Sequence, residues 1–314
     1  MADGETHAPA LDRAAMRAWL LGDDVVDAHG RVFAWQHGHA YPEAGGLWLS
    51  WAADEPAAAA RAPAVAAWLD HCIDTDAVGR DAVRYLFDLA VVLLGRMRFA
   101  HSRGASWSPS MQRGCAQLLD ALARGVACWP EAGAPRWSRA FASHLRKLAL
   151  LSRWLPAPHG ARVRELLLGR IGATEAVPPR PSAHADATYL HAFLYALEGQ
   201  WALLGPGSCA AAATWLTAAQ REDGGVCAWW SVEGGGRGPA RADATAQAIR
   251  LWAAVDREAH APAIARGLGF LARQLEGGAV RYDDTSAHRN VWCTLFAVQA
   301  QDFAHAGARV EALL

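Results

Sequence analysis

The sequence is short of lysine, of closely spaced cysteine pairs and of long hydrophobic runs. Lys147 is the only lysine in a chain of 314 residues that has 30 lysines and arginines together. The net charge is −1, so nothing indicates a polyanionic partner such as nucleic acid. The six cysteines form no CxxC pair, and no apolar run approaches the ~18 residues of a membrane helix. With no hydrophobic signal at the N-terminus, we expect reduced thiols, no membrane span and a cytoplasmic protein.

Hydrophobic residues and tryptophan are plentiful instead. Hydrophobic residues make up 53% of the chain and charged residues 19%, which is ample for a large core. The 15 tryptophans suit packing between helices, and they also suit an aromatic-lined cavity. We expect one domain over residues 1–314, with an irregular segment or short hairpin inserted at 22–40.

One unit occurs twice between residues 210 and 299. Segments 213–220 and 267–274 each contain an aromatic–leucine pair and end in glutamine. A Gly-Gly pair and another aromatic residue follow in each copy: Gly224, Gly225 and Trp229 in the first, Gly277, Gly278 and Tyr282 in the second. Each copy then leads into an apolar helix with a polar start, at 241–252 and 288–299. Recurrence at this period is typical of a repeat architecture.

Polar landmarks extend this rhythm over the whole chain. One polar residue marks the start of each apolar helical segment, at intervals of 45 to 56 residues: Glu43, Asp88, His144, His191, Asp243 and Asn290. Each interval accommodates two helices and two loops. We therefore predict an all-α fold, an (α/α)6 toroid in which six apolar inner helices alternate with six amphipathic outer ones. Helices are expected over residues 80–94, 137–151 and 184–204, with a closing helix over 302–314. The landmarks gather at the helix starts, so a polar cavity is expected at one end of the ring.

The two copies resemble the repeats of the terpenoid cyclase and protein prenyltransferase superfamily. The shared pattern is an apolar helix that ends in glutamine, followed by glycine and an aromatic residue, here Gln220 to Trp229 and Gln274 to Tyr282. The match covers about residues 208–299 and implies a toroid. The DxDD motif of the class II cyclases is absent. The prenyltransferase zinc motif is absent too, because Thr245 stands where a cysteine would follow Asp243.

A looser resemblance joins the chain to bacterial proteins of this repeat type that are associated with exopolysaccharide production. It rests on short pieces of sequence: Tyr41 to Trp48, Tyr85 to Asp88, His144 to Lys147, Tyr195 to Glu198 and Arg241 to Gln247. Toroids of this kind also carry sugar epimerases, polysaccharide lyases and glycosidases, which is an analogy of fold alone.

Four residues are candidates for catalysis: His191, Tyr195, Glu198 and Glu43. Residues 191, 195 and 198 share one stripe of a helix, and histidine and tyrosine are able to exchange protons with a substrate. Structural polar packing is the competing interpretation. Glu43 stands at a helix start, where a carboxylate is favourable even without a functional role. The histidines do not follow a zinc-binding pattern, so no metal and no cofactor are indicated.

The candidates for substrate binding are the remaining polar and aromatic residues of the inner helices: Tyr41, Trp48, Asp88, His144, Lys147, His184, Arg241, Asp243, Gln247, His288, Arg289, Asn290 and Trp292. Ion pairing between repeats, helix capping and core packing are the structural alternatives. The pairing of Asp88 with Arg84, four residues earlier, is one example.

This lining suits a hydroxyl-rich or anionic ligand, with Trp48, Trp229 and Trp292 as stacking surfaces. We therefore expect a carbohydrate-active enzyme acting on a glycan or uronate-type sugar, either a small molecule or an oligosaccharide. Its chemistry would be epimerase- or lyase-like proton abstraction, or hydrolysis by Glu43 with Glu198 or Asp243. The alternatives are an isoprenoid or terpene cyclase-like enzyme and a non-catalytic glycan-binding protein of polysaccharide assembly. The sequence leaves the oligomeric state open.

Overall fold

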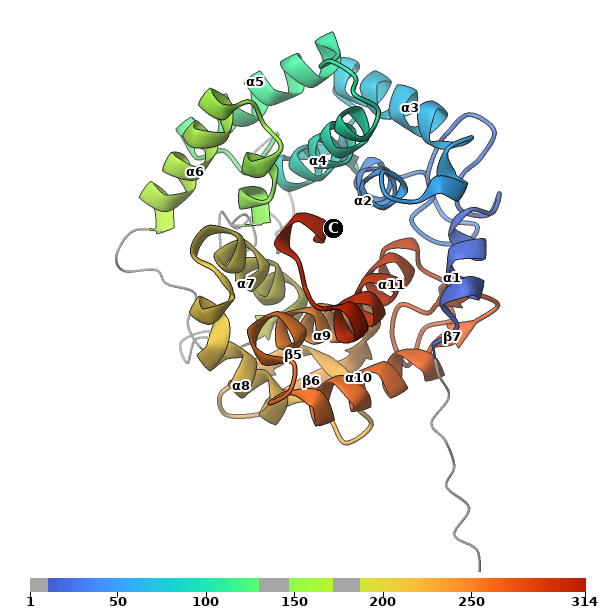
Figure 1. Ribbon diagram of the computed structural model, residues 1–314, viewed down its shortest axis with the longest axis vertical. Coiled ribbons are helices and arrows are strands. Elements are labelled where there is room, and N and C mark those ends of the chain that lie inside the picture. The colour runs from blue at the N-terminus through green and yellow to red at the C-terminus, as the bar shows by residue number, and fades with distance from the viewer. Residues whose placement is uncertain (1–10, 130–146, 172–186) are drawn as a thin grey trace, which may run out of the picture.

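The helices form two concentric rings in the computed structural model, which describes residues 11–129, 147–171 and 187–314 (Figure 1). The described inner helices are α2 (Pro42–Ala52), α4 (Leu86–Ser102), α7 (Leu190–Leu204), α9 (Ala242–Asp256) and α11 (Val291–Ala306). The outer helices are α1 (Arg13–Leu20), α3 (Ala62–Asp74), α5 (Pro109–Arg124), α6 (Ala157–Ile171), α8 (Ala210–Ala219) and α10 (Ala261–Arg273). The predicted (α/α)6 toroid is confirmed. The inner helix expected at 137–151 lies largely outside the described residues, and its described end, from 147, forms 3-10 turns that lead into η4 (Leu151–Arg153).

Burial distinguishes the two rings as the sequence pattern predicts. The inner helix α11 is buried on nearly all sides, whereas the outer helix α10 buries one stripe that includes Ile264, Gly267 and Leu271. Two inner helices touch backbone to backbone at Gly46 of α2 and Gly95 of α4. A Cβ atom on Gly95 would lie 2.3 Å from the Gly46 carbonyl oxygen, so the ring closes here only without a side chain.

The two sequence repeats have matching hydrogen bonds. The Thr245 hydroxyl donates to the Arg241 carbonyl (2.7 Å) and accepts the Val226 N–H (2.9 Å). Thr294 makes the corresponding bonds, to the Asn290 carbonyl (2.7 Å) and from the Val280 N–H (2.9 Å). In each copy a threonine thus ties the strand after the Gly-Gly turn to the first turn of the next inner helix.

Small antiparallel sheets precede several of the inner helices, and these sheets were not predicted from the sequence. One sheet has the order β1 (Gly79–Arg80), β2 (Val83–Tyr85), β3 (Cys128–Trp129), and another has β4 (Thr188–Tyr189), β5 (Val226–Ser231), β6 (Gly235–Arg241). A short hairpin joins β7 (Leu275–Glu276) and β8 (Ala279–Val280). Helices were expected from residues 80 and 184. They begin at 86 and 190, because the residues just before them pair as strands with distant segments.

The expected closing helix at 302–314 is wrong. Helix α11 continues to Ala306, and Gly307 then adopts a φ of 88°, which ends it. A 3-10 turn, η6 (Val310–Ala312), follows, and the C-terminal residues lie over the middle of the ring (Figure 1). The Arg98 guanidinium holds them there by donating to the Leu313 carbonyl (3.2 Å).

Residues 22–40 form turns with isolated bridges, Val26 with Val32 and Phe33 with Ala40. Trp35 also bridges to Asn290, which joins this segment to the start of α11. A further 3-10 turn, η1 (Pro56–Ala58), precedes α3, and another, η5 (Pro206–Cys209), precedes α8.

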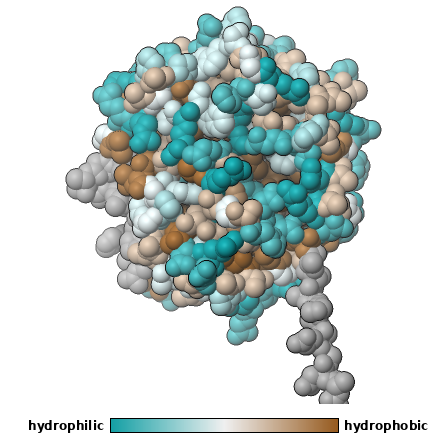
Figure 2. Space-filling view, viewed as in Figure 1, coloured by the Kyte–Doolittle hydropathy of each residue, from teal (hydrophilic) through white to brown (hydrophobic). Residues whose placement is uncertain are grey.

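All six cysteines are buried and unbridged. In the part of the chain that the structure describes, no helix is both long and apolar enough to cross a membrane. On the face drawn in Figure 2, hydrophobic residues lie in scattered patches between hydrophilic ones.

Candidate functional site

A pocket opens where the N-terminal ends of the inner helices converge. The N-cap residues of α2, α4, α7 and α9 line it, namely Tyr41, Tyr85, Tyr189 and Arg241. The extended backbone at each of these positions turns the chain from strand or loop into helix. Residues of the first helical turns complete much of the wall: Glu43, Phe87, Asp88, His191 and Trp292. The volume of the pocket is about 100 Å³, which holds several water-sized groups.

All five tyrosines of the chain line this pocket. They are Tyr41, Tyr85, Tyr189, Tyr195 and Tyr282, and Phe87 and Trp292 add two further aromatic rings. Of the tyrosines, only Tyr41 and Tyr195 were predicted from the sequence as site residues. The available signal was the scarcity of tyrosine together with its position, since three of the five directly precede an inner helix.

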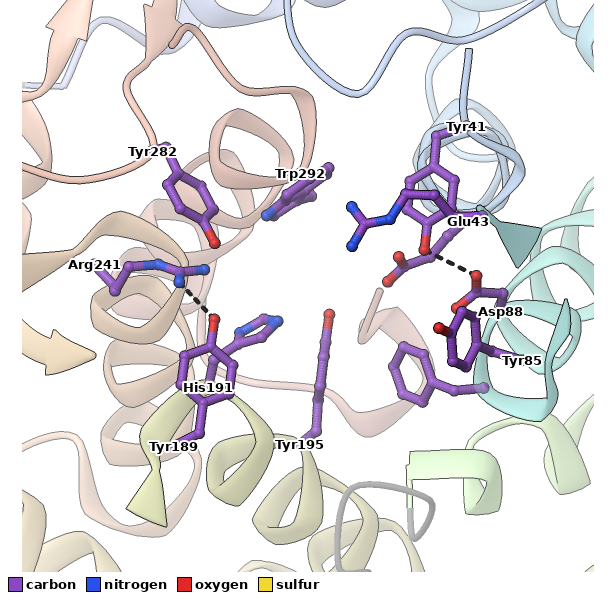
Figure 3. Close-up of a pocket in the computed structure, with 12 residues that line it drawn as sticks. Tyr41, Glu43, Tyr85, Asp88, Tyr189, His191, Tyr195, Arg241, Tyr282 and Trp292 are labelled. Atoms are coloured by element: carbon purple, nitrogen blue, oxygen red, sulfur yellow. Dashed lines mark hydrogen bonds between the residues drawn. The ribbon is translucent and has the colours of Figure 1, made fainter. Parts of the chain in front are cut away.

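One wall of the pocket carries a pair of carboxyl groups (Figure 3). The Tyr41 hydroxyl donates to Asp88 Oδ2 (2.8 Å), and Glu43 lies on the same wall. Burial, reinforced by the nearby charge of Glu43, raises the pKa of Asp88 well above its ordinary value. Burial also raises the pKa of Glu43, although Tyr41 and Lys147 act against it. The pair therefore tends to keep a proton.

The opposite wall carries an ion pair. The guanidinium of Arg241 spans Asp243, with Nε donating to Oδ1 (3.1 Å) and Nη2 to Oδ2, and it also donates to the Tyr189 hydroxyl. The Ala244 N–H donates to Asp243 Oδ1 (2.7 Å). Burial alone would raise the pKa of Asp243, but the charge of Arg241 and these hydrogen bonds hold it below its ordinary value. Asp243 is fully buried behind the wall as a carboxylate.

His191 joins this wall in its neutral form. Its Nδ1 lies 2.6 Å from Gln247 Oε1 and 3.6 Å from Asp243 Oδ2. An amide oxygen only accepts hydrogen bonds, so the proton of the neutral ring belongs on Nδ1 and the lone pair on Nε2. Burial lowers the pKa of His191 to about 4, against the opposing charge of Asp243. The imidazole is thus uncharged at neutral pH and able to accept a proton.

A second charged cluster lies beneath the pocket. Lys147 Nζ is 3.1 Å from Glu198 Oε2, and Arg250 donates to the other oxygen of the same carboxylate. Arg250 also donates to Gln299 Oε1 (2.7 Å). The Lys147 ammonium stands 3.9 Å from the ring centre of Tyr195, and burial lowers the pKa of this lysine to about 8. Glu198 is 1% exposed and does not line the pocket, so the structure does not support the proposed hydrolytic pair of Glu43 and Glu198.

The tyrosines are suited to donate hydrogen bonds. Burial raises the pKa of Tyr41 and Tyr195 well above 10 and that of Tyr189 to about 12. A phenol with so high a pKa stays protonated near neutral pH. The expectation that Tyr195 acts as a base therefore does not fit its surroundings, which favour a hydroxyl donor.

The other predicted site residues lie outside the pocket wall. Trp48 is fully buried in the core and donates to the Leu20 carbonyl (2.8 Å), so it offers no stacking surface. Gln247 is fully buried behind His191, and Asn290 caps α11 by accepting the Cys293 N–H (3.0 Å). Arg289 pairs with Glu276 (2.9 Å), and the exposed His288 stacks on Trp35 with ring centres 5.5 Å apart. His144 and His184 lie outside the described residues.

The pocket also contains an arginine that was not predicted from the sequence. Arg80, at the end of β1, lines it, and its guanidinium stands 5.7 Å from the ring centre of Tyr41. Within residues 11–129, 147–171 and 187–314, no three histidine, cysteine, aspartate or glutamate side chains gather as a metal site.

Comparison with known proteins identifies the fold. No protein family and no curated protein matches the sequence. Among solved structures, a glycosidase in complex with glucose is 14% identical, with a TM-score of 0.67 over 95% of this chain and 97% of that one. Cellobiose 2-epimerase from Spirochaeta thermophila is 14% identical, with a TM-score of 0.62 over 92% and 95%. An α-1,6-mannanase from Salegentibacter is 10% identical, with a TM-score of 0.61 over 94% and 98%. At these identities the chain shares the toroid with these proteins, and the likeness carries no further.

Proposed function

We propose that this protein is a carbohydrate-active enzyme that moves protons to and from a sugar bound in the tyrosine-lined pocket. The observation that carries the proposal is the pairing of opposite walls in Figure 3. A carboxyl pair that retains a proton, Glu43 and Asp88, faces a neutral imidazole, His191. Pairs of titratable groups whose environments push their pKa values apart are typical of acid–base catalysis.

The reaction class that suits this arrangement is epimerisation or elimination. His191 Nε2 would take the proton from the carbon next to a sugar carbonyl or carboxylate. The carboxyl pair on the opposite wall would donate its proton to the oxygen on which charge develops. Return of a proton to the same carbon from the opposite face gives an epimer, and departure of a leaving group from the neighbouring carbon gives an unsaturated product. The tyrosine hydroxyls would hold the sugar hydroxyls meanwhile.

Hydrolysis by two carboxylates is less well supported. Such enzymes place their two carboxyl groups on either side of the scissile bond. Here Glu43 and Asp88 lie on one wall, while Glu198 and Asp243 are each bound to arginine and do not line the pocket.

A uronate is compatible with the site, because Arg80 lines it and arginine binds carboxylates well.

The names of the structural neighbours support a sugar substrate without fixing it. Glucose, cellobiose and an α-1,6-mannan appear in the names of the three neighbours above. The isoprenoid cyclase alternative keeps one observation in its favour, the seven aromatic rings of the wall. Five of these rings carry hydroxyl groups, however, which a hydrocarbon chain does not use.

Exchange of sugar protons with deuterated water tests the proposal. The protein would be incubated in D2O with glucose, cellobiose, α-1,6-mannobiose and glucuronic acid, and proton NMR would follow the C–H signals. We expect loss of one ring-carbon proton signal with the wild type and none with His191→Asn. His288→Asn removes an exposed imidazole outside the pocket and serves as the matched control.

Two results would count against the proposal. If His191→Asn exchanges sugar protons at the wild-type rate, His191 is not the base. Release of reducing ends without any deuterium uptake would indicate a hydrolase. A panel of isoprenoid diphosphates with Mg²⁺ in the same experiment tests the cyclase alternative.

A further inference from the structure

A row of side chains leads from the pocket wall to the protein surface. Strand β4 pairs with β5 so that Tyr189 stands opposite Trp229, and β5 pairs with β6 so that Trp229 stands opposite Arg237. Directly opposite residues of antiparallel strands project from the same face of a sheet. Tyr189 lines the pocket, and its ring centre lies 4.8 Å from that of Trp229. The aromatic surface of the pocket therefore continues outward onto the sheet.

Trp229 is the more exposed of two adjacent tryptophans on β5. It is 41% exposed, and no other phenylalanine, tyrosine or tryptophan among the described residues is as exposed to solvent. The next residue, Trp230, points to the other face of β5 and packs edge-on against Trp215, with ring centres 5.2 Å apart. The alternation of the strand thus packs one indole, partly buried, against the core and leaves the other largely exposed beside the pocket.

The size of the pocket limits how much of an oligosaccharide it can hold. About 100 Å³ is too small for two sugar units, so a second unit would lie at the mouth. A pyranose ring has an apolar face of C–H groups that packs well on an indole ring. A flat, half-exposed tryptophan that directly continues the pocket wall is the surface that such a unit would meet first.

We propose that Trp229 forms an outer subsite, which binds the sugar unit linked to the one in the pocket. This inference rests on the proposed function and narrows the substrate class to oligosaccharides of at least two units. Tyr189 marks the boundary between the two positions, since it lines the pocket and contacts the indole. The exposed Arg237 extends the same face and is placed to contact hydroxyl groups of the outer unit.

Matched pairs of mono- and disaccharides test the subsite. The probes are glucose with cellobiose and mannose with α-1,6-mannobiose, and calorimetry would measure their binding to wild type, Trp229→Ala and Trp229→Phe. In the wild type we expect at least one disaccharide to bind more tightly than its monosaccharide. Trp229→Ala should lose about tenfold in disaccharide affinity and nothing in monosaccharide affinity, and Trp229→Phe should recover part of the loss. Val232→Ala alters an exposed apolar residue in the same hairpin and should change neither affinity.

A spectroscopic signature separates stacking from a general disturbance of the hairpin. In saturation-transfer NMR, protons of the outer sugar ring should receive saturation from the wild type and lose it in Trp229→Ala, while those of the inner ring keep it. If the disaccharide advantage and the outer-ring saturation survive Trp229→Ala, the subsite is wrong although the proposed function stands. If none of the four sugars binds the wild type, the proposed function fails and the subsite fails with it.

Discussion

The two walls of the pocket begin with the same arrangement and end with opposite charge states. On one wall Tyr41 caps α2 and Glu43 follows two residues later, and on the other Arg241 caps α9 and Asp243 follows two residues later. Burial raises the pKa of both carboxyl groups at the outset. The charge of Arg241 brings the pKa of Asp243 below its ordinary value. The hydrogen bond from the Tyr41 hydroxyl lowers the pKa of Glu43 by less than burial raises it. The identity of the N-cap residue thus decides whether its wall holds a proton or a charge.

His191 lies on the charged wall and still remains neutral. The nearby Asp243 acts to raise the pKa of His191, but burial and the charge of Arg241 act in the other direction and prevail. An imidazole that faces a protonated carboxyl pair can take a proton from a substrate while the pair gives one. Substitution of the ionisable residues on either wall should therefore abolish turnover, but the two walls should differ in the effect on the free energy of unfolding.

Glu43→Gln should produce the largest effect on turnover. Removal of a positioned proton donor lowers the rate by a factor of about 10² to 10⁴.

The same substitution should make the folded state more stable at neutral pH. The raised pKa of Glu43 means that the folded state binds a proton more tightly than the unfolded state, so this group costs stability as pH rises above its unfolded pKa of 4.5. The variant should therefore lose less stability than the wild type as the pH rises above 4.5, measured by urea denaturation. Glu233→Gln, in the exposed hairpin turn, is the control, and equal pH profiles for both variants would contradict this account.

Arg241→Met should affect stability most. It leaves the fully buried Asp243 without its partner, and breaking a buried pair in this way costs about 3–5 kcal/mol in the free energy of unfolding. Arg237→Met, an exposed arginine on the same strand, should change that free energy by less than about 0.5 kcal/mol. Adding Asp243→Asn to Arg241→Met should recover part of the loss, because the uncompensated charge is removed. A double variant no more stable than Arg241→Met would mean that the cost lies in packing.

The ring was predictable from the sequence because every repeat places a polar residue near the start of an apolar helix. The polar residues found in this way include Glu43, Asp88 and His191, all of which lie in first helical turns and line the pocket. Helical periodicity alone does not show which side of an inner helix faces the axis. Trp48 and Trp292 therefore looked equivalent in the sequence, although one lies in the core and the other in the pocket.

The rest of the wall depends on contacts between distant segments. Tyr189 and Trp229 become neighbours through strand pairing across 40 residues, and β4, with only two residues, is too short to be recognised in the sequence. Ion pairing between distant helices was equally hard to predict from the sequence. Glu198 shares a helical stripe with His191, but its binding to Lys147 and Arg250 involves two other parts of the ring.

The pH dependence of stability should report the neutral state of His191. The unfolded imidazole titrates near 6.5, whereas the folded one resists protonation until about pH 4. The unfolded state binds more protons in this window, so stability should fall as the pH drops from 6.5 to 4, by on the order of 3 kcal/mol. His191→Asn should lack this component when urea denaturation is compared across the window. His288→Asn, which removes an exposed ring, should keep it, and a wild-type slope no steeper than that of His191→Asn would show that burial does not lower the pKa of His191.

Tyr41→Phe should give the smallest effect and the finest test of the difference between the walls. It removes one hydrogen bond to Asp88, which costs about 0.5–1.5 kcal/mol in stability. Because that hydrogen bond lowers the pKa of Asp88, its loss should raise the pKa further and move the alkaline limb of the pH–rate profile to higher pH. Tyr282→Phe removes a hydroxyl from the opposite wall and should leave that limb in place. If both variants shifted the limb equally, the proton would belong to the whole pocket, and the carboxyl pair would not be its particular holder.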